Sequence, residues 1–248
     1  MRIVDPSPSR PVIAIVGAGT MVAYHVLRQT EGQVAVRLIA PRESTGRGVA
    51  YGTTDARHLL NVPIARMSLD PDHPDDFLEW LRAKGRSVEV SDFVPRMWFG
   101  EYLESRLATA ASGSGGSLVR ITDAVFSIRP TGRRWRMRLQ HGLSFLADAV
   151  VLAVGEATGE PEERLSALTQ APIVVADPWD AQQLHQAATA RKVLLLGSGL
   201  TALDVAASLA RPGRRMLSVS RSGLLPARHR RRPSPGVLAP PALPEAPM

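Results

Sequence analysis

The chain has 248 residues, of which 44% are hydrophobic and 21% charged, as expected for a soluble protein of one large or two modest domains. It contains no cysteine, which excludes a disulfide framework, a thiolate metal site and a dithiol redox centre. The net charge is +7, but the basic residues follow no known nucleic-acid-binding motif, so a nucleic-acid partner is not expected. No run approaches the roughly 20 apolar residues of a membrane span, and residues 1–11 lack the apolar core of a secretory signal. These features predict a cytoplasmic protein.

The first predicted unit spans residues 12–27. Four apolar residues, 13–16, are typical of a buried parallel strand and lead into Gly17 and Gly19, and a helical pattern follows. This is the strand, glycine turn and helix of a dinucleotide-binding unit. Gly17 allows the tight turn, Gly19 allows backbone N–H groups to approach a pyrophosphate, and the helix adds its positive end. The predicted cofactor contacts here are Gly17, Ala18, Gly19, Thr20 and Met21.

Two positions depart from the usual pattern of such a unit. Val22 stands where the third small residue is expected. Its larger side chain should overpack the contact between helix and strand and destabilise it by on the order of 1–3 kcal/mol unless the helix shifts. The second predicted strand, residues 33–39, is followed by Ala40 where a ribose-binding carboxylate is expected. Glu43 in the next loop is either the substitute ribose ligand or a solvated acid.

The loop at residues 46–69 is long, and its glycines indicate backbone that passes close to a ligand or another chain segment. Asn61 can donate and accept hydrogen bonds at once, which suits the edge of a heterocyclic ring, and the predicted site includes Val62 beside it. His58 is interpreted as a structural loop histidine, with a catalytic role as the alternative.

Helices are predicted over residues 74–83 and 96–111, with Asp72 or Asp75 as the cap of the first. Alternating residues within 135–145 predict a small antiparallel meander. The remaining predicted strands of this region cover residues 118–124 and 148–154, and the second of them ends at Gly155.

A second glycine unit begins with a strand at residues 193–196, followed by a turn at Gly197 and Gly199 and a helix over 200–210. The next strand, 216–219, ends in Ser220 and Arg221 without an acid. An acid there would repel a 2′-phosphate, whereas serine and arginine can bind it, so NADP is favoured over NAD. The predicted contacts are Gly197, Gly199, Leu200, Thr201, Ser220 and Arg221. Two nucleotide units in one chain suggest electron transfer between two nucleotides.

The chain between and after these units yields fewer predictions. A short strand is expected at residues 173–175, and Trp179 is interpreted as a buried aromatic anchor rather than a cofactor stack. Residues 227–248 are rich in proline and arginine and are predicted to be disordered. The predicted domains are a leader at 1–11, a first nucleotide-binding domain with a helical insertion at 12–160, a partial second nucleotide-binding domain at 161–226 and the tail at 227–248.

The chain contains four distinctive stretches, which are GRGVAYGT, HLLNVP-x-x-RMS, DFLEWL and FVPRMWFGEYL. They resemble bacterial FAD/NAD(P)-binding proteins related to flavin-dependent urate and aspartate hydroxylases. The resemblance covers residues 12–226. It implies an α/β fold: a Rossmann-like FAD-binding domain with a parallel sheet and a small antiparallel meander, plus a partial second Rossmann-like NAD(P) domain. It also implies that the backbone of Val125 approaches the adenine and that Gly155 marks the return between domains. Asp204 resembles an aspartate of the family's second motif, or is a charge near a helix start.

The resemblance implies an FAD- and NADPH-dependent oxidoreductase of the hydroxylase type. NADPH would dock on the second turn and reduce FAD held on the first, and molecular oxygen would serve to hydroxylate a small polar substrate. No catalytic acid or base and no metal site is identified. The alternative is a truncated or degenerate member that binds nucleotide weakly and has no turnover, suggested by Val22, by Ala40 and by a second domain shorter than the family's. A nucleic-acid binder with a basic tail is the third hypothesis. The substrate and the oligomeric state stay open.

Overall fold

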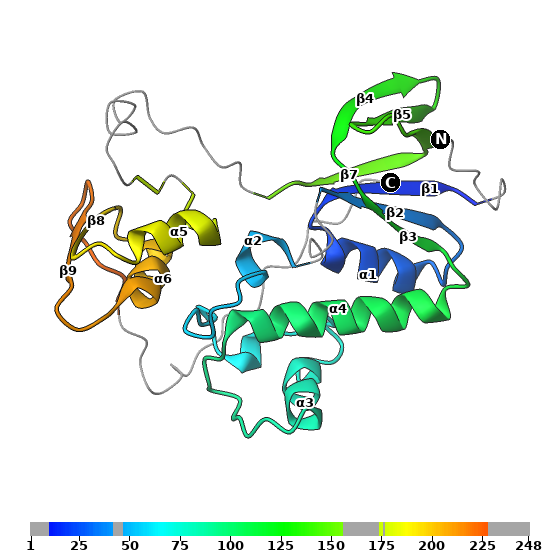
Figure 1. Cartoon of the computed structure of the whole chain (residues 1–248). Coiled ribbons are helices and arrows are strands. Elements are labelled where there is room, and N and C mark those ends of the chain that lie inside the picture. The colour runs from blue at the N-terminus through cyan, green and yellow to red at the C-terminus, as the bar shows by residue number, and fades with distance from the viewer. Residues whose placement is uncertain (1–9, 42–46, 156–173, 176, 228–248) are drawn as a thin grey trace.

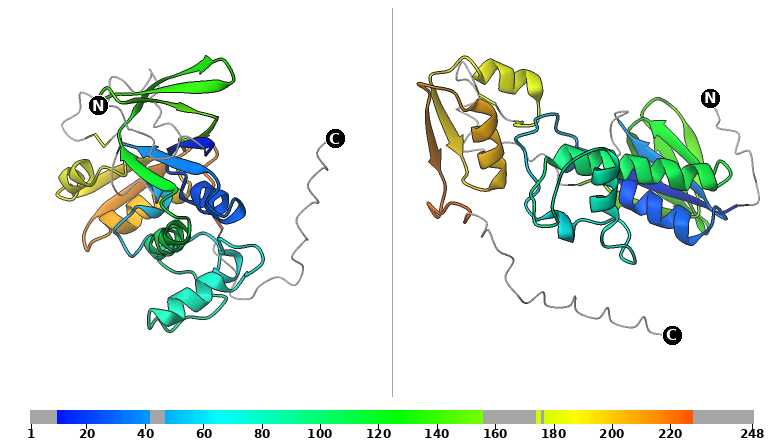
Figure 2. Two further views of the ribbon diagram at one scale, coloured as in Figure 1. Left: turned by 90° about the vertical axis from the view of Figure 1, so that its right-hand side faces the viewer. Right: turned by 90° about the horizontal axis from the view of Figure 1, so that it is seen from below.

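The computed structural model describes residues 10–41, 47–155, 174–175 and 177–227. Two α/β units are visible, with a helical insertion between them (Figures 1 and 2). The first unit contains a four-stranded sheet in the order β3-β2-β1-β7, in which all pairs are parallel. Its strands are β1 (Val12–Gly17), β2 (Ala35–Ala40), β3 (Leu118–Thr122) and β7 (Ala149–Ala153).

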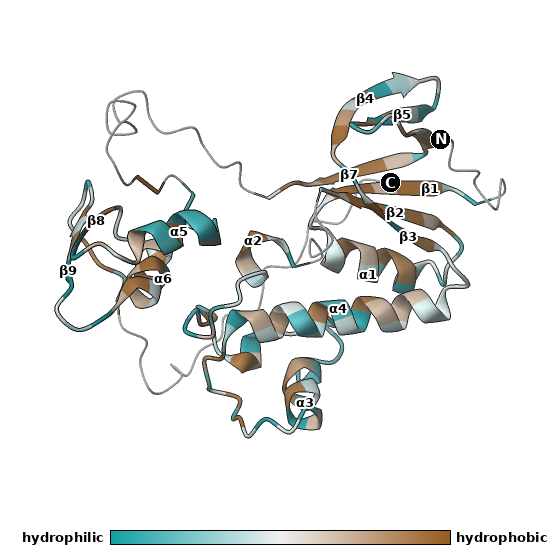
Figure 3. Ribbon diagram, in the orientation of Figure 1, coloured by the Kyte–Doolittle hydropathy of each residue, from teal (hydrophilic) through white to brown (hydrophobic). Residues whose placement is uncertain are grey.

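Both faces of this sheet are covered, which explains why β1 and β7 are apolar throughout and β2 is apolar except at Arg37 (Figure 3). Successive side chains of a strand point to opposite faces. Ala14 packs in a cluster with Met137 and Leu139 from an antiparallel sheet, whereas Ile15 belongs to the core beneath the helices. The antiparallel sheet is formed by β4 (Val125–Thr131), β5 (Arg134–Leu139) and β6 (Ser144–Ala147). It confirms the predicted meander and adds one strand to it.

The other face carries α1 (Thr20–Gln29) and α4 (Arg96–Gly113), which lie side by side (Figures 1 and 2). The insertion between β2 and α4 contains α2 (Gly48–Tyr51), the 3-10 helix η1 (Ile64–Arg66) and α3 (Asp76–Ala83). The predicted long loop therefore includes two short helices.

The predicted capping of α3 is wrong. Asp75 occupies the N-cap position, but its φ of −91° and ψ of 0° are not the extended values with which a capping side chain reaches back to the helix, and it makes no capping hydrogen bond. The Asp72 side chain does not cap the helix either, and its backbone N–H donates to Asp70. The predicted strand at 173–175 is absent from residues 174 and 175, and residue 173 lies outside the described part, as do most of the predicted leader and tail.

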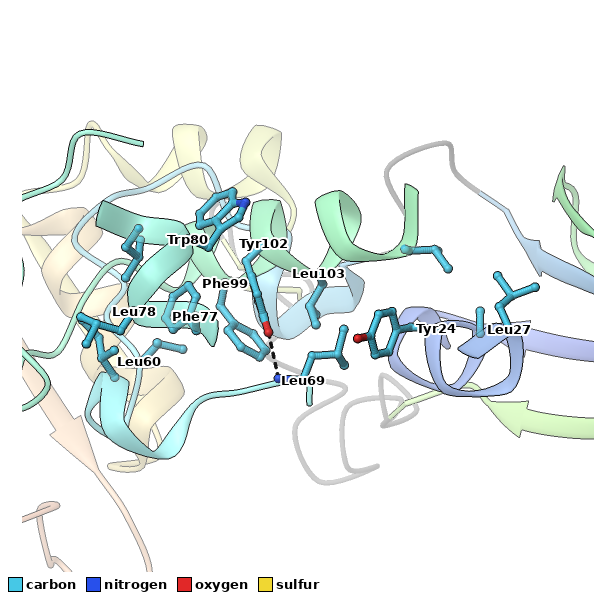
Figure 4. Close-up of a cluster of buried hydrophobic side chains, with 14 of the residues drawn as sticks. Tyr24, Leu27, Leu60, Leu69, Phe77, Leu78, Trp80, Phe99, Tyr102 and Leu103 are labelled. Carbon is cyan, nitrogen blue, oxygen red and sulfur yellow. Dashed lines mark hydrogen bonds between the residues drawn. The ribbon is translucent and has the colours of Figure 1, made fainter. Parts of the chain in front are cut away.

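An aromatic cluster fixes the insertion to α4 (Figure 4). The ring of Phe77 lies 5.1 Å from the rings of both Phe99 and Tyr102, centroid to centroid. The Tyr102 hydroxyl donates to Asp76 Oδ2 at 2.5 Å and accepts the backbone N–H of Leu69 at 3.1 Å. Burial, with a contribution from Asp76, raises the pKa of Tyr102 to about 12.

Tyr102→Phe should lower the free energy of unfolding by about 1–3 kcal/mol, because it leaves the Leu69 N–H and Asp76 without this partner. The raised pKa also predicts the direction of alkaline unfolding. The protonated phenol is favoured in the folded state, so its contribution is present below about pH 10 and is lost as the pH rises toward 12. Urea unfolding at pH 8 and pH 11 measures both effects.

Tyr24→Phe is the matched control, because that buried hydroxyl only accepts from Arg28, a largely exposed side chain. A loss no larger for Tyr102→Phe than for Tyr24→Phe would contradict the role given to the Tyr102 hydroxyl.

The second unit contains the parallel pair β8 (Lys192–Leu196) and β9 (Arg215–Val219) with helices α5 (Ala181–Ala187) and α6 (Leu200–Leu209). Its small core joins Val193 and Leu195 to Val205 and Leu209. The periodicity of the sequence thus predicted the strand–turn–helix–strand order of this unit, with bounds that differ by one residue.

Candidate functional site

The first glycine turn lies at the carboxyl end of β1, beside the end of β7. Gly17 has a φ of +100°, and a Cβ placed on it would lie 2.3 Å from the carbonyl oxygen of Ala153. The backbone N–H of Ala18 donates to that same oxygen at 3.1 Å. Both the backbone conformation and the neighbouring strand therefore require glycine at position 17.

Gly19 packs closely against the sheet, in addition to the nucleotide contact that its spacing predicts. A Cβ on Gly19 would lie 2.3 Å from Cγ2 of Ile15 and 3.2 Å from Cβ of Ala153. The closest approach of helix α1 to the sheet thus falls at Gly19, while Val22 is half-buried against the core and α1 is unbroken. This placement explains how the chain accommodates valine at the third position of the motif.

The start of α1 fits an anionic group. Its N-cap residue is Gly19, no side chain caps the helix, and its first turn holds no acid. The first backbone N–H groups of a helix have no intrahelical acceptor, and the helix dipole favours negative charge there. The Thr20 side chain is fully buried and Met21 is 45% exposed, so a ligand at this end would meet the backbone of Thr20 and both backbone and side chain of Met21.

Helix α2 lies against this turn. Gly48 has a φ of +59°, and a Cβ on it would lie 3.0 Å from Cβ of Ala18. Arg47, just before the helix, donates from Nη2 to Glu104 on α4 at 2.7 Å. The prediction that glycines of this loop approach another chain segment is confirmed at Gly48.

The other predicted FAD contacts that the structure describes lie near the carboxyl ends of the parallel strands or in the insertion. Val125 begins β4 three residues after the end of β3, and Gly155, with a φ of +71°, follows β7, so both lie near the carboxyl ends of the parallel strands. Asn61 is exposed and Val62 is half-buried, and the backbone N–H of neighbouring Leu60 donates to Val94, before α4. Glu43 lies outside the described residues.

The second glycine turn is open. Gly197 has a φ of +123°, and a Cβ on Gly197 or on Gly199 would meet no atom within 4 Å. Gly199 is the N-cap of α6, where no side chain caps the helix and no acid lies in the first turn. Nothing in the described protein requires glycine at 199, whereas a ligand close to the backbone would. Leu200, Thr201 and Arg221 are exposed around this edge, and Ser220 is half-buried.

A polar contact joins the loop before η1 to helix α6 of the second unit. Ser208 Oγ donates to Asp55 Oδ2 at 2.7 Å and lies 2.7 Å from Nε2 of His58. Because the serine has one proton and uses it on Asp55, His58 must donate from Nε2. The His58 Nδ1 atom is hydrogen-bonded to Thr53 at 2.7 Å. His58 is 5% exposed with both ring nitrogens engaged, which favours its structural interpretation.

Arg57 strengthens the same contact by donating to the carbonyl oxygens of Ala207 and Ser208. Its guanidinium, with the Ser208 hydroxyl, holds the pKa of Asp55 well below the ordinary value. Two further residues lie at this junction. Asp204 on α6 pairs with Arg96 at 3.0 Å, and Trp179 lies under the Arg96 guanidinium and edge-on to His58. Trp179, which precedes α5 of the second unit, thus contacts two side chains of the first unit.

Asp55→Asn should loosen α6, because it weakens the hydrogen bonds from Arg57 and Ser208. For this partly exposed carboxylate we expect a loss of about 1 kcal/mol, or about fivefold faster hydrogen exchange of the α6 amides at pH 7. Glu79→Gln is the control, since Glu79 is an exposed acid on α3. Equal exchange of α6 in both variants would contradict the contribution assigned to Asp55.

A cavity of about 600 Å³ lies elsewhere, between α1, α4 and the loop before α3. Its charged walls include the pairs Arg106–Asp76 and Arg28–Asp70, and it contains none of the predicted nucleotide contacts. Within the described residues, no three metal-ligating side chains gather, and no helix has the length and apolar character to cross a membrane.

Comparison with known proteins agrees with this geometry. A protein-family model described as FAD-NAD(P)-binding matches residues 14–157, more than half of the chain. None of the curated proteins compared with the chain matches it. Similar solved structures include ornithine hydroxylase from Pseudomonas aeruginosa, with 18% identity and a TM-score of 0.58 over 86% of this chain and 54% of that chain. They also include L-lysine 6-monooxygenase from Pseudomonas syringae, with 19% identity and a TM-score of 0.56 over 84% of this chain and 53% of that chain.

The present chain thus spans about half the length of these two enzymes, and at such identities the likeness concerns the fold alone. It confirms the predicted α/β fold. The family match covers the first glycine turn, α1, the insertion and the four-stranded sheet apart from Val12 and Ile13. The chain belongs to the FAD-NAD(P)-binding family.

Proposed function

We propose that this protein is an FAD-dependent, NADPH-using oxidoreductase of the hydroxylase or monooxygenase type, related to the bacterial urate and aspartate hydroxylases. The observation that carries the proposal is the pair of glycine turns, each opening a helix that has neither a capping side chain nor an acid in its first turn. One such turn lies inside the region that matches the FAD-NAD(P)-binding family. Ornithine hydroxylase and L-lysine 6-monooxygenase share the fold, which supports the reaction class.

In this proposal the first turn holds FAD. The backbone at Ala18, Gly19 and Met21 would bind the pyrophosphate, Glu43 the ribose and the backbone of Val125 the adenine. Asn61 and Val62 would border the flavin ring, and Gly155 would leave room at the end of β7. Bound flavin supplies hydride acceptance and oxygen chemistry, while the protein binds, orients and shields the reacting groups.

The second turn would hold NADPH on the backbone at Gly197, Gly199, Leu200 and Thr201. Ser220 and Arg221 follow β9 directly, and the exposed Arg221 side chain is accessible to a 2′-phosphate. A small polar molecule and molecular oxygen are the proposed substrates, and the cytoplasm is the proposed compartment.

The test is the colour and oxygen consumption of the purified full chain. Protein that carries flavin absorbance and consumes oxygen when NADPH is added supports the proposal. Protein that is colourless and does not bind added FAD overturns it.

Arg221→Ala tests the choice between NADPH and NADH. We expect it to weaken NADPH binding about tenfold, the equivalent of one charged hydrogen bond, and to leave NADH binding unchanged. Arg191→Ala, at an exposed arginine before β8, is the control and should alter neither affinity. An equal loss for NADPH and NADH in Arg221→Ala would exclude recognition of the 2′-phosphate.

One observation favours a second candidate, a nucleotide-binding module without turnover. Ala40 is the last residue of β2, where dinucleotide sites commonly place a ribose-binding carboxylate, and it is buried and paired with Thr122. Nucleotide binding without NADPH oxidation would establish this alternative.

A further inference from the structure

Arg96 has one edge of its guanidinium unused. It is the first residue of α4, and its Nη1 atom lies 3.0 Å from Oδ2 of Asp204 in the second unit. Its guanidinium carbon lies 4.7 Å from the centre of the Trp179 ring. The other two nitrogens, Nε and Nη2, are buried and have no hydrogen-bond partner among the described residues.

The position of these two nitrogens matters because Nε and Nη2 carry the parallel N–H groups of one side of the guanidinium. That side matches two oxygens of a carboxylate or a phosphate at once. Buried charged donors that lack an acceptor are costly, and native proteins leave few of them. In the described part of the chain, Arg47 and Arg86 each have one such nitrogen, whereas Arg96 has two.

The surroundings also suit a small anion. The one carboxylate paired with Arg96 is Asp204, and it occupies the opposite nitrogen. Tyr51 lies close enough for the charge of Arg96 to act on its phenol, although burial has the larger effect and raises the pKa of Tyr51 above its ordinary value. The Tyr51 hydroxyl is therefore protonated at neutral pH and can donate.

We propose that the free edge of Arg96 binds an oxyanion in bidentate fashion at the junction of α4 and the second unit, with Trp179 as a stacking wall. The anion is a carboxylate or phosphate group, brought by the substrate or by the nicotinamide dinucleotide, and in this respect the inference rests on the proposed function. Because the two nitrogens are closed to solvent, binding requires the junction to open locally.

The experiment uses the full chain labelled with ¹⁵N and follows the arginine Nε–H signals by NMR. The Arg96 signal is identified by its loss in Arg96→Lys. Inorganic phosphate, acetate and NADPH are titrated separately. We expect the Arg96 signal to shift saturably with at least one of them. A response to NADPH and phosphate identifies the dinucleotide as the source, and a response to acetate with NADPH already bound identifies an acidic substrate.

The second readout is the rise in thermal midpoint that the responding anion causes. Arg96→Lys keeps the positive charge beside Asp204 but loses the two-pronged edge, and it should raise the apparent Kd of that anion at least tenfold. Arg86→Lys is a matched control, because Arg86 also pairs with a carboxylate, Glu101, and lies 3.7 Å from the centre of a tryptophan ring, Trp98. It should change the Kd less than twofold.

An Arg96 signal unmoved by all three probes, or equal losses of affinity in both variants, would overturn the inference. If the chain binds FAD and oxidises NADPH while Arg96 stays silent, the inference alone fails. If Arg96 responds to phosphate or acetate in protein that binds no FAD, the proposed function alone fails.

Discussion

Gly17→Ala is expected to lower the free energy of unfolding by about 2–5 kcal/mol. About 1–2 kcal/mol comes from holding alanine at positive φ, and about 1–3 kcal/mol from overpacking. The clash would be with backbone, since the new Cβ would lie 2.3 Å from the carbonyl oxygen of Ala153. Ala153 cannot withdraw without disturbing its pairing with β1 in the central sheet. Urea unfolding measures the loss, and the fraction of protein recovered with flavin should fall in parallel.

Gly142→Ala separates the two contributions. Gly142 has a similar φ of +88°, but a Cβ on it would meet no atom within 4 Å. Gly142→Ala should therefore lower the free energy of unfolding by only about 1–2 kcal/mol, the contribution of the unfavourable φ. If both variants lost the same stability, the close approach of β7 would contribute nothing to the requirement for glycine at position 17.

The strands and helices around the two turns could be predicted because their pattern follows directly from burial. A strand covered on both faces must be apolar at every position, as residues 13–16 are, and a helix against it must be apolar at helical spacing. The ends were less predictable. Pro74 and Asp75 are compatible with the first turn of a helix, yet Asp75 takes backbone angles that keep it outside α3 and makes no capping hydrogen bond.

The roles of the glycines could not be read from their spacing. Gly19 and Gly199 occupy the same motif position, but only at Gly19 does the protein itself fill the place of a Cβ. What surrounds that place depends on strand β7 and on Ile15, which the local sequence does not specify. The junction at His58 and Ser208 was also beyond prediction, since the two residues are 150 positions apart and no local pattern places them in contact.

The difference between the two turns leads to the second large effect, expected for Gly199→Asp. Asparagine, aspartate and serine are better N-caps than glycine, and a negative charge at a helix start is favourable by about 0.3–1 kcal/mol. The new side chain would enter open space at a φ of −77°, which any residue adopts. The free energy of unfolding should therefore stay the same or rise slightly.

NADPH binding should change in the opposite direction. The aspartate side chain would occupy the approach to the N–H groups at the start of α6 and repel a phosphate there, so we expect the Kd for NADPH to rise about 100-fold, or about 2.7 kcal/mol. Gly199→Asn, similar in size and also a good cap, should give a smaller rise, because it blocks the approach without the charge. Calorimetric titration with NADPH measures both. A wild-type Kd for NADPH in Gly199→Asp would exclude the second turn as the NADPH site. If the variant instead keeps or gains stability while it loses affinity for NADPH, the open space beside Gly199 is the space that the ligand occupies.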